Sequence, residues 1–249
     1  MVTVQGQPPN ICRKQRKIML GIIGAMAQEV EQLKEAMEQP QIETVAGMEF
    51  YKGTIGGKEA VVVQSGIGKV SAGICAQILA DRYGVTGIIN TGIAGSLKAE
   101  INIGDLVMST DALQHDVDAV NFGYELGQIP QLPVKAFPTD EKLRELAVEL
   151  CARVNPDITA HQGRVLTGDQ FISDRAKKEW LTANFGGACT EMEGAAIAQA
   201  AYLNQIPVLI IRAISDKADD SASMDYGEFE QMAILHSVRL TRALIEAYA

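Results

Sequence analysis

An uninterrupted apolar run late in the chain, PVLII at 207–211, leads directly into the polar residues Arg212, Ser215 and Asp216. Strands that are buried on both faces of a parallel sheet have continuous hydrophobic runs of this kind. In open α/β sheets, ligands bind beyond the carboxyl ends of such strands. We therefore predict a sheet covered by helices, with a binding site where this strand ends.

Apolar runs alternate with helix-periodic segments along the rest of the chain. Strands are predicted at 18–23, 49–55, 59–64, 87–90, 105–110, 163–167 and 207–214, and helices at 28–38, 70–83, 141–154, 175–183, 193–204 and 229–247. This alternation predicts βαβ units in a single-domain, three-layer α/β/α fold with a central mixed sheet. No linker or internal repeat divides residues 18–249, which we assign to one domain.

The first residues need a separate interpretation. Residues 1–17 are polar and end in a basic cluster, and the apolar segment IMLGIIGAMA follows at 18–27. A secretory signal has a similar order of basic, apolar and small residues. Two glycines interrupt this apolar segment, however, and it runs straight into the helix predicted from Gln28. We therefore favour a disordered tail over 1–17, followed by a buried first strand.

Composition narrows the range of partners. The formal net charge of −9 argues against nucleic acid, because proteins that bind phosphate backbones carry basic patches. No run of 18 or more apolar residues is present, so we predict no membrane span. The four cysteines lack metal-ligand and CxxC spacing, which indicates reduced thiols in a cytoplasmic protein; they are Cys12, Cys75, Cys151 and Cys189.

The sequence contains no motif for binding a metal or a nucleotide cofactor. His115 and Asp116 lie near Asp111 and Asp118, but without the spacing of a metal site, so we interpret these acids as solvated loop residues. The glycine-rich turns lack the spacing of a P-loop or a dinucleotide-binding loop; they are GIIG at 21–24, SGIGKVS at 65–71 and GIAG at 92–95. We predict no metal and no cofactor. Glycines at strand ends still let the backbone approach a ligand closely.

Glu29 lies in the first turn of the helix predicted at 28–38. The helix dipole favours an acid at this position, and such a role is purely structural. The same dipole keeps the carboxylate ionised and able to accept a proton, as a general base must be. The residues alone leave both interpretations open.

Three further acids gather near the end of the chain. Glu191 and Glu193 precede a segment of glycine, alanine and isoleucine that predicts a buried helix, and buried carboxylates need partners. A ribose diol offers two donors to one carboxylate, although first-turn acids of a helix are the simpler alternative. Asp216 follows a buried strand, where desolvation raises a carboxyl pKa toward that of a general acid. Alternatively, Arg212 and Asp216 form an ion pair that only closes the sheet end.

Seven short motifs follow one another in order along the chain: GIIGAMAQEV at 21–30, SGIGKV at 65–70, NTGIAGS at 90–96, FGYELGQIP at 122–130, TGDQFI at 167–172, EMEGAAIA at 191–198 and RAISDKAD at 212–219. With these motifs, the chain from about Lys17 onward resembles the bacterial 5′-methylthioadenosine/S-adenosylhomocysteine nucleosidases of the purine nucleoside phosphorylase superfamily. The resemblance implies hydrolysis of the N-glycosidic bond in both nucleosides, which releases adenine with 5-methylthioribose or S-ribosylhomocysteine.

The resemblance also implies residue roles. Glu29 is expected to activate water with Arg212 nearby, and Asp216 is expected to protonate N7 of adenine with support from Ser215. Glu193 is expected to hold the ribose hydroxyls. The other implied substrate-binding positions are Met26 and Met192 beside the sugar, Phe171 and Ile172 at adenine, Ala94 and Gly95 in a loop at 91–96, and Ile67 and Tyr226 at the 5′-alkylthio group.

Phe122, Tyr124 and Pro130 are expected to reach the alkylthio pocket of a second subunit, so the resemblance implies a homodimer. The aromatic segment 122–130 would otherwise expose apolar surface. One position departs from the family pattern, which usually has serine where this chain has Ile93. Glu29 and Arg212 must then position water without that hydroxyl, and the preference among alkylthio substrates stays open.

Related and unrelated functions compete with this interpretation. A phosphorolytic enzyme of the same superfamily needs several anion donors, whereas the loops offer Arg212 and Lys69 but few other basic residues. A non-catalytic nucleoside-binding module would not require Glu29, Glu193 and Asp216 together. Hydrolysis of aminodeoxyfutalosine needs the same purine and ribose contacts and also stays open.

Overall fold

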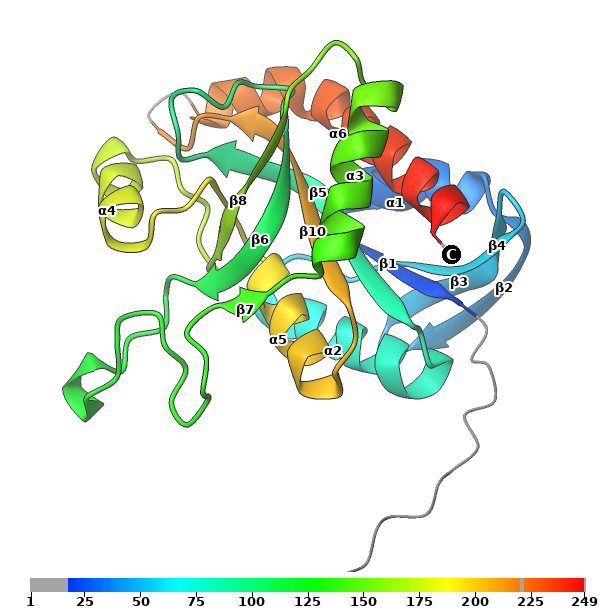
Figure 1. Ribbon diagram of the computed structural model, residues 1–249, viewed down its shortest axis with the longest axis horizontal. Helices are drawn as coiled ribbons and strands as arrows, with labels where there is room; N and C mark the ends of the chain where they lie inside the picture. The colour runs from blue at the N-terminus through cyan, green and yellow to red at the C-terminus, as the bar shows by residue number, and fades with distance from the viewer. Residues whose placement is uncertain (1–17, 220–221, 249) are drawn as a thin grey trace, which may run out of the picture.

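A mixed sheet forms the centre of the molecule, and helices cover both of its faces (Figure 1). The structure, a computed structural model, describes residues 18–219 and 222–248, with the backbone alone for 222–228. The strands are β1 (Leu20–Gly24), β2 (Glu38–Val45), β3 (Met48–Ile55), β4 (Lys58–Gln64), β5 (Gly87–Ser96), β6 (Leu106–Gln114), β7 (Phe137–Pro138), β8 (Ala160–Thr167), β9 (Cys189–Glu191) and β10 (Val208–Asp216). The predicted tail over 1–17, which includes Cys12, lies outside the described residues.

The helices are α1 (Ala27–Glu35), α2 (Lys69–Ile78), α3 (Glu141–Val154), α4 (Arg175–Phe185), α5 (Gly194–Asn204) and α6 (Ala222–Ala247), and a π-helical turn (Leu79–Tyr83) extends α2. Asp140 and Asp174 cap α3 and α4, because their side chains accept hydrogen bonds from first-turn amides. Gly186 ends α4 in the left-handed conformation. Among the described residues, no helix has both the length and the apolar character that crossing a membrane requires.

The sheet runs in the order β10-β6-β8-β9-β5-β1-β4-β3-β2, and β10 also pairs with β5. Strands β5, β10, β6, β8 and β9 therefore form a closed ring, from which the other strands extend. The pairings of β1 with β4, β1 with β5 and β10 with β5 are parallel, so the carboxyl ends of these strands lie together. The predicted three-layer α/β/α fold with a central mixed sheet is confirmed.

Two hydrophobic cores separate the three layers. Helices α1, α3 and α6 pack on one face of the sheet, and α2 and α5 pack on the other (Figure 1). Ile22 and Ile211 belong to the first core, whereas their neighbours Ile23 and Ile210 belong to the second. Successive strand residues point to opposite faces. Both faces are buried here, which explains why these strands have continuous apolar runs.

The sequence prediction was wrong at several elements. It missed β2, an edge strand with exposed side chains and no apolar pattern, and β9, which has only three residues. The helix predicted at 28–38 ends at Glu35, because Glu38 already belongs to β2. The loop predicted at 91–96 is instead the second half of β5. Its backbone continues to pair with β10 as far as Gly95.

Candidate active site

A cavity of about 380 Å³ opens at the carboxyl ends of β1, β5 and β10. The start of α1, the loops that follow β4 and β8, and the segment after β9 complete its walls. Its lining includes most of the predicted site residues: Met26, Glu29, Ile67, Ala94, Gly95, Phe171, Met192, Glu193, Arg212, Ser215 and Asp216. Residues from six separate parts of the chain thus meet at the edge of the sheet where the apolar run predicted a site.

The cavity lies beside a gap in the sheet. On the side of β5 opposite β10, β1 pairs only as far as Asn90, and β9 begins to pair at Gly95. Between them, the Ile93 amide donates to Glu29 Oε1 at 3.2 Å, and Arg212 Nη1 donates to the Ile93 carbonyl at 3.2 Å. Buried backbone groups need such partners. Glu29 and Arg212 therefore replace a strand neighbour while they face the cavity.

Glu29 forms one end of the cavity. It lies in the first turn of α1, as predicted, and only 2% of the residue is exposed. Its Oε2 accepts hydrogen bonds from the amides of Ala25 at 2.7 Å and Met26 at 2.9 Å. Burial raises the pKa of Glu29, and this effect outweighs the Arg212 guanidinium and the three amides, which all lower the pKa.

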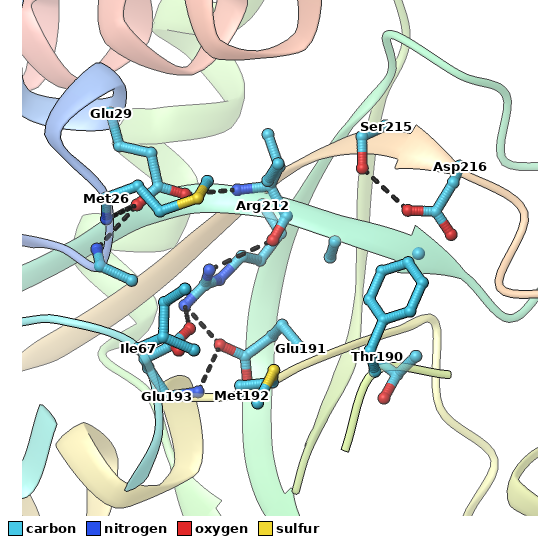
Figure 2. A pocket seen from close by; sticks show the side chains of 15 residues that line it. Met26, Glu29, Ile67, Thr190, Glu191, Met192, Glu193, Arg212, Ser215 and Asp216 are labelled. Carbon is cyan, nitrogen blue, oxygen red and sulfur yellow. Dashed lines mark hydrogen bonds and ion pairs between the residues drawn. The ribbon is translucent and has the colours of Figure 1, made fainter. Parts of the chain in front are cut away.

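Arg212 occupies the centre of the site (Figure 2). The guanidinium is buried, contacts the Glu191 carboxylate and the Asn90 side chain, and lies 3.5 Å from Glu193. Asp216 lies toward the other end of the cavity (Figure 2). The alternative in which Arg212 and Asp216 form the ion pair is therefore wrong, because Glu191 at the end of β9 and Glu193 just after it are the carboxylate partners of Arg212.

Glu191 and Glu193 have different surroundings. Glu191 is fixed by the amide of Glu193 at 3.1 Å, the amide of Gly194 at 2.8 Å and the hydroxyl of Thr167. Glu193 accepts a hydrogen bond from the Gly68 amide at 2.9 Å. Burial raises the pKa of Glu193 to about 7; the positive charge of Arg212 opposes this rise, and the negative charge of Glu191 adds to it. Glu193 is thus poised to change its charge near neutral pH.

Asp216 forms the other end of the cavity. The register between β10 and β5 shifts between Ile214 and Asp216. Neighbouring residues of a regular strand point to opposite faces, whereas this irregularity lets both Ser215 and Asp216 line the cavity. The Ser215 hydroxyl donates to Asp216 Oδ2 at 2.9 Å, and the Ala218 amide donates to Oδ1 at 2.8 Å. Both carboxyl oxygens are therefore held in place.

Two glycines of β5 make room for these side chains. A Cβ atom at Gly92 would lie 2.5 Å from Glu29 Oε1 and 2.6 Å from Arg212 Nη1. A Cβ atom at Gly95 would lie 2.6 Å from Asp216 Oδ1. Glycine inside a strand often marks such a close approach. Each end of the cavity therefore requires its own glycine.

The two predicted adenine-binding residues, Phe171 and Ile172, do not both line the main cavity. Phe171 lines the main cavity and is 53% exposed. Ile172 is buried and lines a neighbouring cavity of about 40 Å³, which shares Gly95, Phe171, Met192 and Asp216 with the main one. The side chain of Ile172 therefore supports this wall from behind.

Three further predicted residues do not line the cavity of this chain. Phe122, Tyr124 and Pro130 belong to a segment that extends away from the rest of the molecule (Figure 1, green, lower left). Phe122 is 83% exposed, on a short 3₁₀ helix (Val120–Phe122). Tyr226 is in α6, but its side chain lies outside the described part of the structure.

The acids around His115 have partners in the protein. Asp111 pairs with Arg164 at 2.6 Å, and Asp116 pairs with Lys69 at 2.6 Å, with 16% of the Asp116 side chain exposed. The interpretation of these two acids as solvated loop residues is therefore wrong. Within the described ranges, no group of three or more histidine, cysteine or acidic residues has the geometry of a metal site.

Two polar residues that were not predicted from the sequence, Asn90 and Thr167, hold the charged side chains of the site in place. Asn90 binds both the Arg212 guanidinium and the Ile23 carbonyl. Thr167 joins the Glu191 carboxylate to the Ala195 amide. Both residues end apolar strand segments, which was the available signal. Their partners come from strands distant in the sequence, so spacing could not identify those partners.

Comparison with known proteins shows the class of protein to which this chain belongs. A model of the phosphorylase superfamily matches residues 19–246, which is nearly the whole chain. A 5′-methylthioadenosine/S-adenosylhomocysteine nucleosidase from Shewanella pealeana is 43% identical and covers 91% of this chain and 98% of its own. The nucleosidase of that name from Halalkalibacterium halodurans is 44% identical over 91% of this chain and 97% of its own.

A solved structure agrees with these sequence matches. The nucleosidase of the same name from Colwellia psychrerythraea superimposes with a TM-score of 0.88 at 38% identity, covering 92% of this chain and 95% of that one. The chain therefore belongs to the 5′-methylthioadenosine/S-adenosylhomocysteine nucleosidase family, and it is an N-glycosyl hydrolase.

Proposed function

We propose that this enzyme hydrolyses the N-glycosidic bonds of 5′-methylthioadenosine and S-adenosylhomocysteine, with Glu29 activating water and Asp216 protonating adenine. The observation that carries the proposal is the placement of these two buried carboxyl groups at opposite ends of one cavity (Figure 2). The names of the relatives supply the two substrates. The Colwellia structure contains adenine, which supports a purine as the leaving group.

Charge development in the reaction explains why both ends are acidic. Breaking the ribosyl C–N bond builds positive charge on the sugar and negative charge on adenine, as in other oxocarbenium-like glycoside chemistry. Asp216 gives its proton to N7 as adenine leaves. At the other end, Glu29 takes a proton from the water that attacks the sugar. The amides of Ala25, Met26 and Ile93 hold the Glu29 carboxylate in one orientation.

The middle of the cavity suits a cationic sugar. Three buried carboxyl groups, those of Glu29, Glu191 and Glu193, surround the single guanidinium of Arg212. Fixed charges in a water-excluding site act strongly on the charge that develops in a transition state. Glu193 holds the ribose hydroxyls, because its carboxylate can accept hydrogen bonds from both. Met26 and Met192 supply apolar surface beside the sugar.

The same charges favour hydrolysis over phosphorolysis. Among the described residues that line the cavity, Arg212 is the one cation, and Glu191 and Glu193 neutralise it. Lys69, the other candidate anion donor, pairs instead with Asp116. A phosphate anion would therefore meet net negative charge. The Ile93 side chain adds no polar group, and its backbone amide binds Glu29 instead.

An adenine-release assay tests this function directly. The enzyme should release adenine from 5′-methylthioadenosine and from S-adenosylhomocysteine at the full rate in phosphate-free buffer, and it should leave inosine intact. A requirement for phosphate would support the phosphorolytic alternative. Absence of adenine from every incubation would support a nucleoside-binding module.

Substrate affinity should depend on pH through Glu193. Its pKa of about 7 exceeds the ordinary carboxyl value, so the empty site holds a proton there below neutral pH. A ribose diol binds the ionised form, and affinity is therefore lost as pH falls through this value. We expect the Kd for 5′-methylthioadenosine to rise about tenfold between about pH 8 and pH 6.

Calorimetry with the Asp216→Asn protein, in which turnover is slow, measures this dependence before much of the substrate is hydrolysed. Glu193→Gln in the same background should bind more weakly at both pH values and should lose the pH dependence. If the Asp216→Asn protein, in which Glu193 is unchanged, has the same Kd at both pH values, Glu193 does not bind the ribose.

We also propose a homodimer in which the partner's 122–130 segment completes the alkylthio end of the pocket. Apolar side chains are exposed on α2, on α5 and on this segment, including Val70 at 74%, Leu203 at 59% and Phe122 at 83%. A groove of about 570 Å³ runs between α2 and α5. Exposed apolar patches of this kind mark interfaces. The second copy is the occupant that the family resemblance implies.

Mixed dimers should show this sharing of residues. Phe122→Ser should raise KM for 5′-methylthioadenosine about tenfold, because an aromatic wall of the pocket is lost. Refolding that variant together with Asp216→Asn should recover about a quarter of the wild-type activity at low substrate, since half of the dimers are mixed and each has one intact site. No recovery, or sedimentation of the wild-type chain as a monomer, would contradict the proposal.

The cysteines fit a reducing compartment, and we propose a cytoplasmic location. Cys75, Cys151 and Cys189 are unpaired and buried in the described structure. Burial raises the pKa of the Cys75 thiol to about 12, which keeps it protonated and unreactive.

A further inference from the structure

We propose that Lys178, on α4, is a positioning residue for Asp216, because it clamps the segment 217–219 that holds the Asp216 carboxyl group. This inference rests on the proposed function, in which Asp216 is the acid. Lys178 does not line the cavity, and it acts through the backbone of the neighbouring segment.

Ala218 is the link between the clamp and the acid. Its amide donates to Asp216 Oδ1 at 2.8 Å, and its side chain is fully buried. Its φ of 51° lies in the left-handed region, which residues with a Cβ atom disfavour. Such a conformation persists only where the surroundings hold it, and it is often found at functional sites. Something must therefore fix the chain on both sides of Ala218.

Lys178 fixes both sides. Its Nζ donates to the Lys217 carbonyl at 2.6 Å, directly before Ala218, and lies 3.4 Å from Asp219 Oδ2, directly after it. Only 18% of the Lys178 side chain is exposed, so water competes weakly for these bonds. Hydrogen bonds from a charged donor are stronger than neutral ones. One ammonium group thus spans the strained residue.

Lys217 adds a second attachment on the other side of the segment. Its Nζ donates to the Ile101 carbonyl at 2.6 Å and to the Ala99 carbonyl at 3.4 Å, both in the loop after β5. The segment after β10 is therefore held between α4 and the end of β5. This arrangement holds the Ala218 amide in the orientation in which it donates to Asp216.

The same helix supports the opposite wall of the purine end. The loop that carries Phe171 and Ile172 leads into α4, and Ile172 packs in one hydrophobic cluster with Ala218 and with Leu181 of α4. Lys178 therefore connects the wall that faces adenine to the segment that aims the acid. A loss of this connection should change where the proton is delivered more than how the nucleoside binds.

Three variants test the clamp. Lys178→Met removes the ammonium and keeps a long side chain, Lys178→Arg restores a charged donor, and Lys177→Met is the matched control on the same helix. The Nζ of Lys177 lies over the Trp180 ring at 4.4 Å and takes no part in the clamp. Adenine release from 5′-methylthioadenosine is measured for each variant, with thermal unfolding to confirm that each is folded.

We expect Lys178→Met to lower kcat about tenfold, with KM within about twofold of wild type, because a misplaced acid slows the proton transfer. Lys178→Arg should recover most of kcat, and Lys177→Met should match wild type. Unchanged kcat in Lys178→Met, or an equal loss in Lys177→Met, would overturn the clamp while leaving the proposed function intact. Failure of the wild-type enzyme to release adenine would instead overturn the proposed function.

Discussion

Asp216→Asn should lower kcat for adenine release by about 10²–10⁴-fold while the protein stays folded. Asparagine matches the shape of aspartate and can still accept the hydrogen bonds from Ser215 or Ala218 on its oxygen. It has no carboxyl proton to give to N7, so adenine must leave as an anion. Steady-state kinetics with 5′-methylthioadenosine, together with a thermal unfolding curve, measures both parts of this expectation.

A change of leaving group separates this effect from general damage. 4-Nitrophenolate is stable as an anion, so a 5-methylthioriboside that carries it needs no acid. Asp216→Asn should cleave this compound at close to the wild-type rate. Asp157→Asn, at an exposed acid on the loop before β8, is the matched control and should behave as wild type. Near-normal adenine release by Asp216→Asn would remove Asp216 from the mechanism.

Glu29→Gln should also lower kcat by about 10²–10⁴-fold, because no base remains to accept a proton from water. It should in addition destabilise the fold by about 1–3 kcal/mol. Three backbone amides donate to the Glu29 carboxylate, and the amide group of glutamine has only one acceptor atom. At least one buried amide then loses its partner. Thermal unfolding should show the lower stability, and kinetics should be measured well below the new midpoint.

The pH dependence gives Glu29 its own signature. Burial raises the pKa of Glu29 above the ordinary value of 4.5, and water activation requires the ionised form. At saturating substrate, where Glu193 already holds the ribose hydroxyls, the wild-type kcat should therefore begin to fall, as pH is lowered, at a higher pH than an ordinary carboxyl group would allow. Glu31→Gln, at an exposed residue of the same helix, should keep this profile. A wild-type profile that stays flat down to the ordinary value would contradict Glu29 as the base.

The sequence predicted the elements whose local pattern matches their tertiary role. The apolar run of β10 marked a strand buried on both faces, and the polar residues after it marked the edge where the cavity lies. The helix at 141–154 was predicted at its exact bounds, because α3 has one apolar face and an aspartate cap. In each case the local sequence pattern and the tertiary packing favour the same secondary structure.

Other parts depend on contacts that no local pattern records. The partners of Arg212 are set by β9, a strand of three residues whose pairing with β5 brings Glu191 beside the guanidinium. The irregularity near Asp216 arises from pairing between β10 and β5, and it changes which side chains face the cavity. The sequence could therefore indicate the acids of the site, but not their ion pairs.

The closed ring of strands also limits which mutations can change the substrate specificity of such an enzyme. β5 is flanked by β10 along most of its length and by β1 and β9 on its other side. Substitutions near its reactive groups would disturb several strands at once and are heavily constrained. Ile67 and Phe171 are both more than half exposed at the rim, where residues can vary without that penalty. Laboratory evolution toward bulkier thioethers should therefore accumulate its changes at the rim and spare the interior.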